Sequence, residues 1–181
     1  ILEQVKLSLY SGQCILLAGE NGSGKTTLLK ILAGLETPTR AEVEYADTTQ
    51  PWKTAVRRYR REVIYLHQTP YLFNGTVASN VAYGLRFTGL NREQQQQALA
   101  RGLVWANLTE QAKRPAHTLS GGIRQRVAFT RAWVLSPKIL LLDEPIANMD
   151  DASRKQTCDL LGRMKSAGMS IVITSHDAQP F

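Results

Sequence analysis

Residues 19–27 read Gly-Glu-Asn-Gly-Ser-Gly-Lys-Thr-Thr, and this stretch decides the fold of the 181-residue chain. An apolar run, Cys14–Ala18, precedes it, and a run with helical spacing, Leu28–Ala33, follows it. The order is therefore strand, glycine-rich loop, helix. Glycines let the backbone turn tightly and bring its N–H groups against phosphate oxygens. The start of the helix adds the positive end of its dipole, so the stretch predicts a phosphate site.

The spacing also matches the P-loop pattern, in which Gly-Lys-Thr follows the first glycine after four residues. Four fixed positions coincide by chance at roughly 4 × 10⁻⁵ per start site, or ~1% over this length, so a plain glycine turn is the weaker interpretation. We expect Lys25 to reach the β- and γ-phosphates of a nucleotide and the Thr26 hydroxyl to ligate Mg²⁺. The predicted nucleotide-binding residues here are Gly19, Glu20, Asn21, Gly22, Ser23, Gly24, Lys25, Thr26 and Thr27.

Composition indicates one globular domain over residues 1–181. The chain is 43% hydrophobic and 20% charged, and no apolar run approaches the about 18 residues that span a bilayer. It begins at Ile1 without a methionine and stops abruptly at Phe181, so we expect a piece of a longer protein, cut at both ends. The isolated Cys14 and Cys158 predict reduced, buried thiols in a cytosolic protein.

The net charge is +7, and a local cluster contains Arg57, Arg58, Arg60 and Arg61. Such a cluster is usually a solvated face, with an anionic membrane surface or nucleic acid as the sharper alternative. Since we expect a longer protein, whose other residues would alter the total, the net charge carries little weight, and we expect no nucleic-acid partner.

Residue patterns predict an α/β fold. Alternation predicts strands over 5–9 and 41–45, and unbroken apolar runs predict buried strands over 14–18, 62–66, 138–144 and 170–175. Helical spacing predicts helices from Lys25 to Ala33, within 73–114, and over 120–135 and 152–167, whereas 51–61 is expected to be a loop or a frayed helix. Asn91 with Gln94 forms a predicted capping box. The alternation implies a mainly parallel sheet covered on both faces, with a helical lobe inserted after Gln68.

Polar residues follow three further predicted strands, at the sheet edge where ligands gather in parallel α/β folds. Asp143 closes an apolar strand and is expected to hold Mg²⁺. The adjacent Glu144 is expected to accept a proton from the attacking water. The structural alternative for this pair is a helix N-cap with a first-turn acid, which Pro145 also fits. Gln68 is expected to contact Mg²⁺ and water, and His176 the γ-phosphate, although a histidine after a strand is more often a loop residue.

Residues 119–126 read Leu-Ser-Gly-Gly-Ile-Arg-Gln-Arg and predict a second anion site. Ser120 is expected to cap a helix while Gly121 and Gly122 leave its backbone N–H groups bare. The plain alternative is a well-capped helix start. The functional interpretation is that this helix start addresses the γ-phosphate of a nucleotide held by another subunit.

These motifs, in this order, resemble the ATP-binding domain of ABC transporters over essentially the whole chain. By that resemblance, residues 19–27 are Walker A, Gln68 is the Q-loop, 119–126 the signature, Asp143 and Glu144 the Walker B pair, 147–150 the D-loop, and His176 the switch histidine. The resemblance implies a RecA-like P-loop NTPase core (1–72 and 115–181), an N-terminal antiparallel β portion, and a helical subdomain (73–114) that packs with the signature helix (120–135).

Three departures from the family pattern stand out. Ile123 replaces the usual glutamine or glutamate of the signature, while Ser120 and both glycines are kept. The D-loop carries Ala147-Asn148-Met149 rather than Ser-Ala-Leu. Tyr10 is too close to the P-loop to match the adenine-stacking aromatic residue of the family, which is therefore expected upstream of Ile1.

The resemblance also implies a mechanism and partners. Two copies bind head to tail around two Mg²⁺-ATP, with Lys25, Gln68, Glu144 and His176 as catalytic residues and Thr26, Gln68 and Asp143 at the metal. Hydrolysis drives import through separate transmembrane permease subunits with a substrate-binding protein, so the chain sits peripherally on the cytoplasmic side of the membrane. Residues 67–73 and 80–86 resemble importer ATPases for tungstate, molybdate and related oxyanions.

The alternative is a soluble ABC ATPase of iron–sulphur assembly, DNA repair or translation. The short distance from Gln68 to Ser120 argues against coiled-coil arms, and two cysteines argue against a zinc-bearing repair protein. The single ATPase unit weakens the tandem translation type, and the iron–sulphur type stays open. A P-loop kinase would leave the signature motif unexplained.

Overall fold

A four-stranded, wholly parallel sheet forms the centre of the computed structural model, which describes residues 2–45, 48–147 and 149–176. Its strands lie in the order β1-β6-β5-β4. They are β1 (Cys14–Ala18), β4 (Val63–Leu66), β5 (Ile139–Asp143) and β6 (Ser170–Ser175). The pairing places Ala18 opposite Ser175, Asp143 opposite Thr174, and Leu66 opposite Leu142. Since all strands run the same way, their carboxyl ends meet at one edge.

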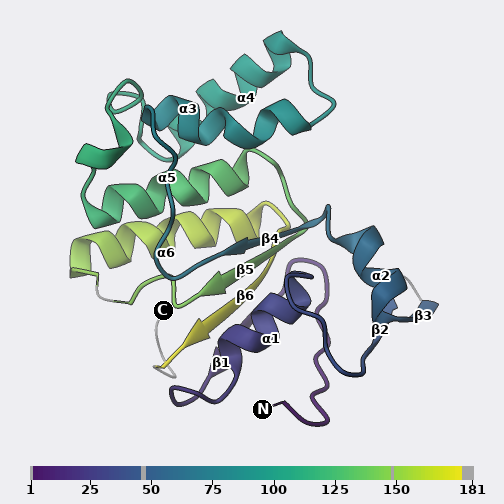
Figure 1. Cartoon of the computed structure of the whole chain (residues 1–181). Helices are drawn as coiled ribbons and strands as arrows, with labels where there is room; N and C mark the ends of the chain where they lie inside the picture. The colour runs from purple at the N-terminus through teal and green to yellow at the C-terminus, as the bar shows by residue number, and fades with distance from the viewer. Residues whose placement is uncertain (1, 46–47, 148, 177–181) are drawn as a thin grey trace.

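Helices cover both faces of this sheet (Figure 1). On one face lies α1 (Lys25–Leu32), whose fully buried Leu29 packs with Leu141 and Val172. On the other lie α5 (Gly121–Trp133) and α6 (Asp151–Ser166), which bring Phe129 and Met164 against that face of the sheet. Successive strand residues point to opposite faces, which explains why the buried strands are continuously apolar.

A helical lobe packs on the outer side of α5. It contains α3 (Val77–Ala82), the 3₁₀ helices η1 (Tyr83–Phe87) and η2 (Ala116–Thr118), and α4 (Arg92–Trp105). The lobe core includes Val77, Val81 and Leu108, and α5 contributes Val127 to it. One helix thus serves two apolar cores. The predicted capping box of Asn91 with Gln94 is confirmed, each side chain accepting from the other residue's backbone N–H at 2.9 Å.

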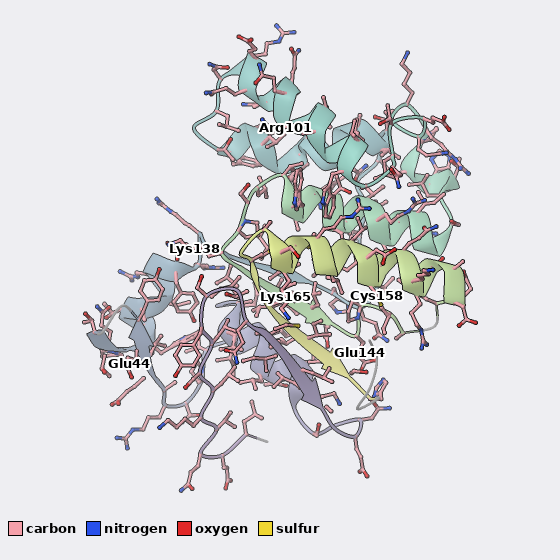
Figure 2. All side chains as sticks on the ribbon, turned by 180° about the vertical axis from the view of Figure 1, so that it is seen from behind. Glu44, Arg101, Lys138, Glu144, Cys158 and Lys165 are labelled. Atoms are coloured by element: carbon pink, nitrogen blue, oxygen red, sulfur yellow. The ribbon has the colours of Figure 1, made fainter. Side chains whose placement is uncertain are left out.

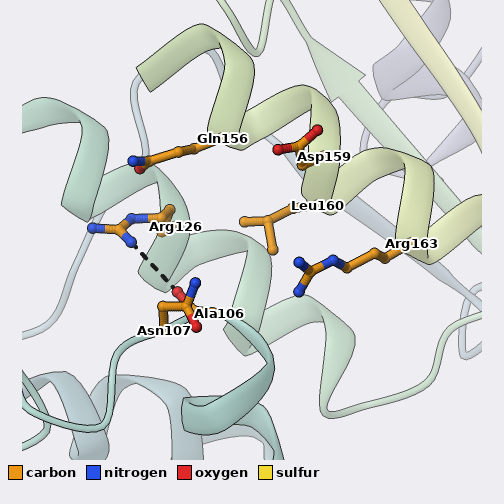
Figure 3. A pocket seen from close by; sticks show the side chains of 7 residues that line it. All are labelled: Ala106, Asn107, Arg126, Gln156, Asp159, Leu160 and Arg163. Carbon is orange, nitrogen blue, oxygen red and sulfur yellow. Dashed lines mark hydrogen bonds between the residues drawn. The ribbon is translucent and has the colours of Figure 1, made fainter. Parts of the chain in front are cut away.

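Two arginines tie the end of α4 to the helices on the sheet. Arg126 of α5 donates to the Ala106 carbonyl at 3.5 Å, and Arg163 of α6 donates to the Trp105 carbonyl at 3.1 Å. Figure 3 shows the side chains of these two arginines around a small hollow, which Asn107 also lines. Cationic side chains at the end of a helix satisfy carbonyls that lack helical partners, so this hollow is a structural joint between the lobe and the core.

A two-stranded antiparallel sheet lies apart from the central sheet. It pairs β2 (Glu42–Tyr45) with β3 (Thr48–Pro51), and α2 (Trp52–Tyr59) follows directly. Trp52, Ala55 and Tyr59 are buried together. The prediction of a strand over 41–45 is confirmed, but β3 was not predicted, and the expected loop or frayed helix at 51–61 is an ordered helix with a packed face. The side chains of Arg57, Arg60 and Arg61 are exposed.

Two further predictions are wrong. Residues 5–9 alternate in polarity but form no strand, because no neighbouring strand in the described part of the chain pairs with them. The thiols are not buried in a core: Cys14 is exposed at the start of an outer strand, and Cys158 is half-buried on α6. Among the described residues, no helix is long and apolar enough to cross a bilayer.

Candidate functional site

The glycine-rich loop joins β1 to α1 at the carboxyl edge of the sheet. Gly22 and Gly24 have φ angles of 80° and 94°, in the left-handed region that favours glycine. Gly24 is also the N-cap of α1 and offers no side-chain cap, so the first N–H groups of the helix lack a side-chain acceptor from that residue. The Lys25 amine lies over the loop and donates to the carbonyls of Gly19 at 2.6 Å and Glu20 at 2.8 Å.

Asp143 ends β5 with a buried carboxylate, 4% exposed, that accepts three hydroxyl groups. The Thr26 hydroxyl donates to Oδ1 at 3.1 Å, the Thr174 hydroxyl donates to Oδ1 at 2.8 Å, and the Tyr65 hydroxyl donates to Oδ2 at 3.0 Å. Burial, followed by the Asp143 charge, raises the pKa of Tyr65 well above its usual value, so the phenol keeps its proton and remains a donor. The P-loop threonine and the strand-end aspartate therefore meet, as the sequence predicts.

Glu144 lies just beyond the strand end, with φ at +47° and a side chain that is 13% exposed (Figure 2). Its Oε2 lies 2.6 Å from His176 Nε2 and accepts a hydrogen bond from Gln68 Nε2 at 3.2 Å. Gln68, Glu144 and His176, which follow three separate strands, thus meet at one atom, Glu144 Oε2. The alternative of a helix N-cap for Asp143 and Glu144 is wrong, because the next helix, α6, begins at Asp151 and is capped by Asp150.

The signature stretch places an uncapped helix start at the surface. Ser120 is the N-cap of α5 by position, but its side chain makes no capping hydrogen bond, so that part of the prediction is wrong. Ser120 and Gly121 are exposed. None of the hydrogen bonds described above joins them to the cluster of Lys25 and Glu144. The first N–H groups of α5 therefore have no acceptor from the Ser120 side chain.

Ile123 has an internal role. It is half-buried and packs against the lobe core, which gives a physical reason for an apolar residue at this place in the signature. Gln125, two residues on, is buried and donates to the Pro145 carbonyl at 3.2 Å. This bond links the signature helix to the turn after Glu144, and nothing in the spacing of the sequence signals it.

The D-loop leads into the start of α6. The Asp150 carboxylate accepts from the Ser153 backbone N–H at 2.8 Å and from the Ser153 hydroxyl at 3.0 Å. These bonds, the backbone one first, lower the pKa of Asp150. Met149 Sδ lies 3.6 Å from the Thr157 hydroxyl. Asn148 lies outside the described residues.

The donor set fits Mg²⁺ rather than a transition metal. Within the described ranges no group of three or more His, Cys, Asp and Glu side chains is placed to hold a metal ion. The Asp143 carboxylate and the Thr26 hydroxyl, 3.1 Å apart, supply hard oxygen atoms. Mg²⁺ is commonly held by one or two such groups together with substrate phosphates and water.

Tyr10, which lies too close to the P-loop in the sequence to match the adenine-stacking residue of the family, is 72% exposed.

Comparison with known proteins identifies the family. Residues 2–147 match the family described as ABC transporter. The chain is 37% identical to the nickel import ATP-binding protein LarO of Lactiplantibacillus plantarum, over 98% of this chain and 77% of that protein. It is 38% identical to the sulfate/thiosulfate import ATP-binding protein CysA of Mesorhizobium japonicum, over 98% of this chain and 52% of that protein. The relatives favour a transport-coupled ATPase over the soluble alternatives.

Solved structures agree with this assignment. The cbiO1 protein of Clostridium perfringens, described as part of the ABC transporter complex cbiONQ, superposes with a TM-score of 0.87 at 26% identity, over 97% of this chain and 72% of that one. The ATP-binding cassette MJ0796, a dimer in a post-hydrolysis state bound to ADP and Pi, superposes with a TM-score of 0.81 at 28% identity, over 97% of this chain and 80% of that one. The chain belongs to the ABC transporter family and is an ATP-hydrolysing, nucleotide-binding domain of it.

Proposed function

We propose that residues 19–27 bind the phosphates of ATP and that Thr26, Gln68 and Asp143 hold Mg²⁺, whose positive charge offsets phosphate charge. The observation that carries the proposal is the meeting of four strand ends at one point: Thr26 bonds Asp143, and Gln68 and His176 both contact Glu144. Lys25 would leave the loop carbonyls for phosphate oxygens. Glu144 acts as the base for the attacking water, and His176 donates to the γ-phosphate.

The second half of each ATP site comes from a second copy of the chain. Ser120, Gly121 and Gly122 present an uncapped helix start, which is suited to a γ-phosphate held by the partner. A head-to-tail dimer would bring this surface to the P-loop of the other copy and bury two ATP molecules. The dimeric state of MJ0796 bound to ADP and Pi supports this arrangement.

ATP-driven closing and reopening of the dimer would drive import through transmembrane permease subunits, supplied by a substrate-binding protein. The import relatives support this coupling, but the chain spans 77% of LarO and about half of most of the others, so the activity of the whole protein remains a proposal. We place the permease contact beside Gln68 and on the helical subdomain, 73–114, which packs with the signature helix. The protein would then sit peripherally on the cytoplasmic side of the membrane.

The proposed cargo is a tetrahedral oxyanion such as tungstate or molybdate. The sulfate/thiosulfate relative supports this class, because sulfate is also a tetrahedral dianion. A divalent metal cation is the second candidate, favoured by the nickel relative.

The test is purification of the full-length protein from its native membrane after mild detergent extraction. We expect an integral-membrane partner at a fixed ratio, together with ATPase activity that requires Mg²⁺. Recovery with a soluble scaffold and without any membrane protein would contradict the coupling to transport. Absence of hydrolysis in a folded wild-type protein would contradict the ATPase site itself.

A further inference from the structure

One buried hydroxyl group touches both acids at the end of β5. Thr174 lies on β6 directly opposite Asp143 and is 0% exposed. Its Oγ1 donates to Asp143 Oδ1 at 2.8 Å and accepts the backbone N–H of Glu144 at 3.0 Å. The Leu142 carbonyl lies at 3.5 Å, so the carboxylate is the better acceptor for the hydroxyl proton.

The hydrogen bond from the Glu144 N–H to the Thr174 hydroxyl supports an unusual backbone conformation at Glu144. Glu144 has a φ of +47°, a left-handed conformation that is unfavourable for a residue with a side chain. The residue has just left the strand, where a parallel ladder would otherwise use its N–H. The Thr174 hydroxyl takes that N–H, and the Glu144 carbonyl accepts the N–H of Ala147 at 3.2 Å. Both ends of the turned residue are therefore held.

The turn decides where the Glu144 carboxylate lies. In this backbone conformation the side chain reaches Gln68 and His176, whereas Asp143, one residue earlier, faces Thr26 and Tyr65. The two adjacent acids thus face separate sets of partners. Thr174 bonds to both residues of the pair.

We propose that Thr174 is a positioning residue for the ATPase reaction: through one hydroxyl it fixes the Asp143 carboxylate for the metal and holds the Glu144 backbone in the turn that presents the base. The inference rests on the proposed function of Asp143 and Glu144. Thr174 is fully buried and bonds to the two acids, so its effect passes through them. Tyr65, which holds the other Asp143 oxygen, acts on the metal side alone.

The test compares Thr174→Val with Thr174→Ser in the full-length protein. Valine keeps the shape but removes both hydrogen bonds, whereas serine keeps the hydroxyl. We expect Thr174→Val to lower kcat by about 10- to 100-fold, the usual effect of losing a group that orients a metal ligand, with the KM for ATP within about twofold. Thr174→Ser should recover most of kcat. Tyr65→Phe should weaken metal binding with less effect on kcat at saturating Mg²⁺.

A second readout does not depend on turnover. Mn²⁺ binding in the presence of a non-hydrolysable ATP analogue, followed by the free Mn²⁺ signal in electron paramagnetic resonance, should weaken about tenfold or more in Thr174→Val and Tyr65→Phe. Should Thr174→Val fail to fold, amide hydrogen exchange of Glu144 in the wild-type protein still decides the matter. We expect that N–H to be protected, and rapid exchange would overturn the inference.

The inference is also overturned if folded Thr174→Val keeps kcat and Mn²⁺ binding within twofold of wild type, or if Thr174→Ser is damaged as much as Thr174→Val. Either result with an active wild-type protein leaves the proposed ATPase function intact. A wild-type protein that does not hydrolyse Mg²⁺-ATP would instead contradict the proposed function.

Discussion

Alanine at Gly122 is expected to disturb the contact between the signature helix, α5, and the first turn of α6. A Cβ atom built there would lie 2.5 Å from Ser153 Oγ and 3.1 Å from Ser153 Cβ. Gly121 provides a matched control, because a Cβ there meets nothing within 4 Å. Both glycines are in the first turn of α5, so alanine should favour the helix similarly at each, by up to about 1 kcal/mol.

The magnitude follows from what Ser153 must give up. To make room, its hydroxyl has to rotate away from Asp150 Oδ2, which it now contacts at 3.0 Å. A typical hydrogen bond contributes about 0.5–1.5 kcal/mol net, and an added methyl group in a packed site costs about 1–3 kcal/mol. Because Ser153 is close to the surface, we expect the low end of these ranges. Gly122→Ala should therefore be about 1–2 kcal/mol less stable than Gly121→Ala.

Urea unfolding followed by circular dichroism measures this difference, and thermal unfolding should show it as roughly 2–8 °C in Tm for a domain of this size. Adding Ser153→Ala to Gly122→Ala removes the closest atom and should recover part of the loss, with a coupling free energy of about 0.5 kcal/mol or more. Equal stabilities of Gly121→Ala and Gly122→Ala, or additive effects in the double variant, would refute the reasoning.

Two further predictions concern the catalytic edge of the sheet. Lys25→Ala should lower ATP hydrolysis by about a hundredfold or more, because it removes the cation expected at the phosphates; an unchanged rate in the malachite green phosphate assay would contradict the P-loop assignment. Glu144→Gln keeps the shape and an oxygen for His176 but removes the base, so the variant should bind ATP, barely hydrolyse it and accumulate as a dimer. Size-exclusion chromatography with Mg²⁺-ATP tests this, and a monomer at every concentration would count against the head-to-tail arrangement.

The parts of the site that depend on neighbours in the sequence were predictable. Strand, glycine loop and helix follow one another from Cys14 to Leu32, so the spacing of the glycines and Lys25 is enough to locate the P-loop. The strand that ends at Asp143 and the capping box at Asn91 are equally local. A parallel sheet then brings its strand ends together, which made the meeting of Thr26 with Asp143 predictable.

Contacts between distant segments were not predictable in the same way. Residues 5–9 have the alternation of a strand, but a strand also needs a partner, which a local pattern does not reveal. The missed Tyr65 and Thr174 reach Asp143 from the two neighbouring strands, and the register of each strand against β5 decides which side chains do so. The sequence shows a tyrosine and a threonine in apolar runs, with no sign that their hydroxyls share one carboxylate.

The order of motifs along the chain determined by itself that the glycine-rich loop, Asp143 and Glu144, for which we propose phosphate binding, metal binding and the role of base, would lie at one edge of a sheet, because this depends on spacing and strand direction. Tertiary structure alone decided that Glu144 turns away from Asp143 toward Gln68 and His176, and that Thr174 holds both acids. The physical reason is that a left-handed turn and a buried hydroxyl depend on atoms supplied by residues that are 30 or more positions apart in the chain.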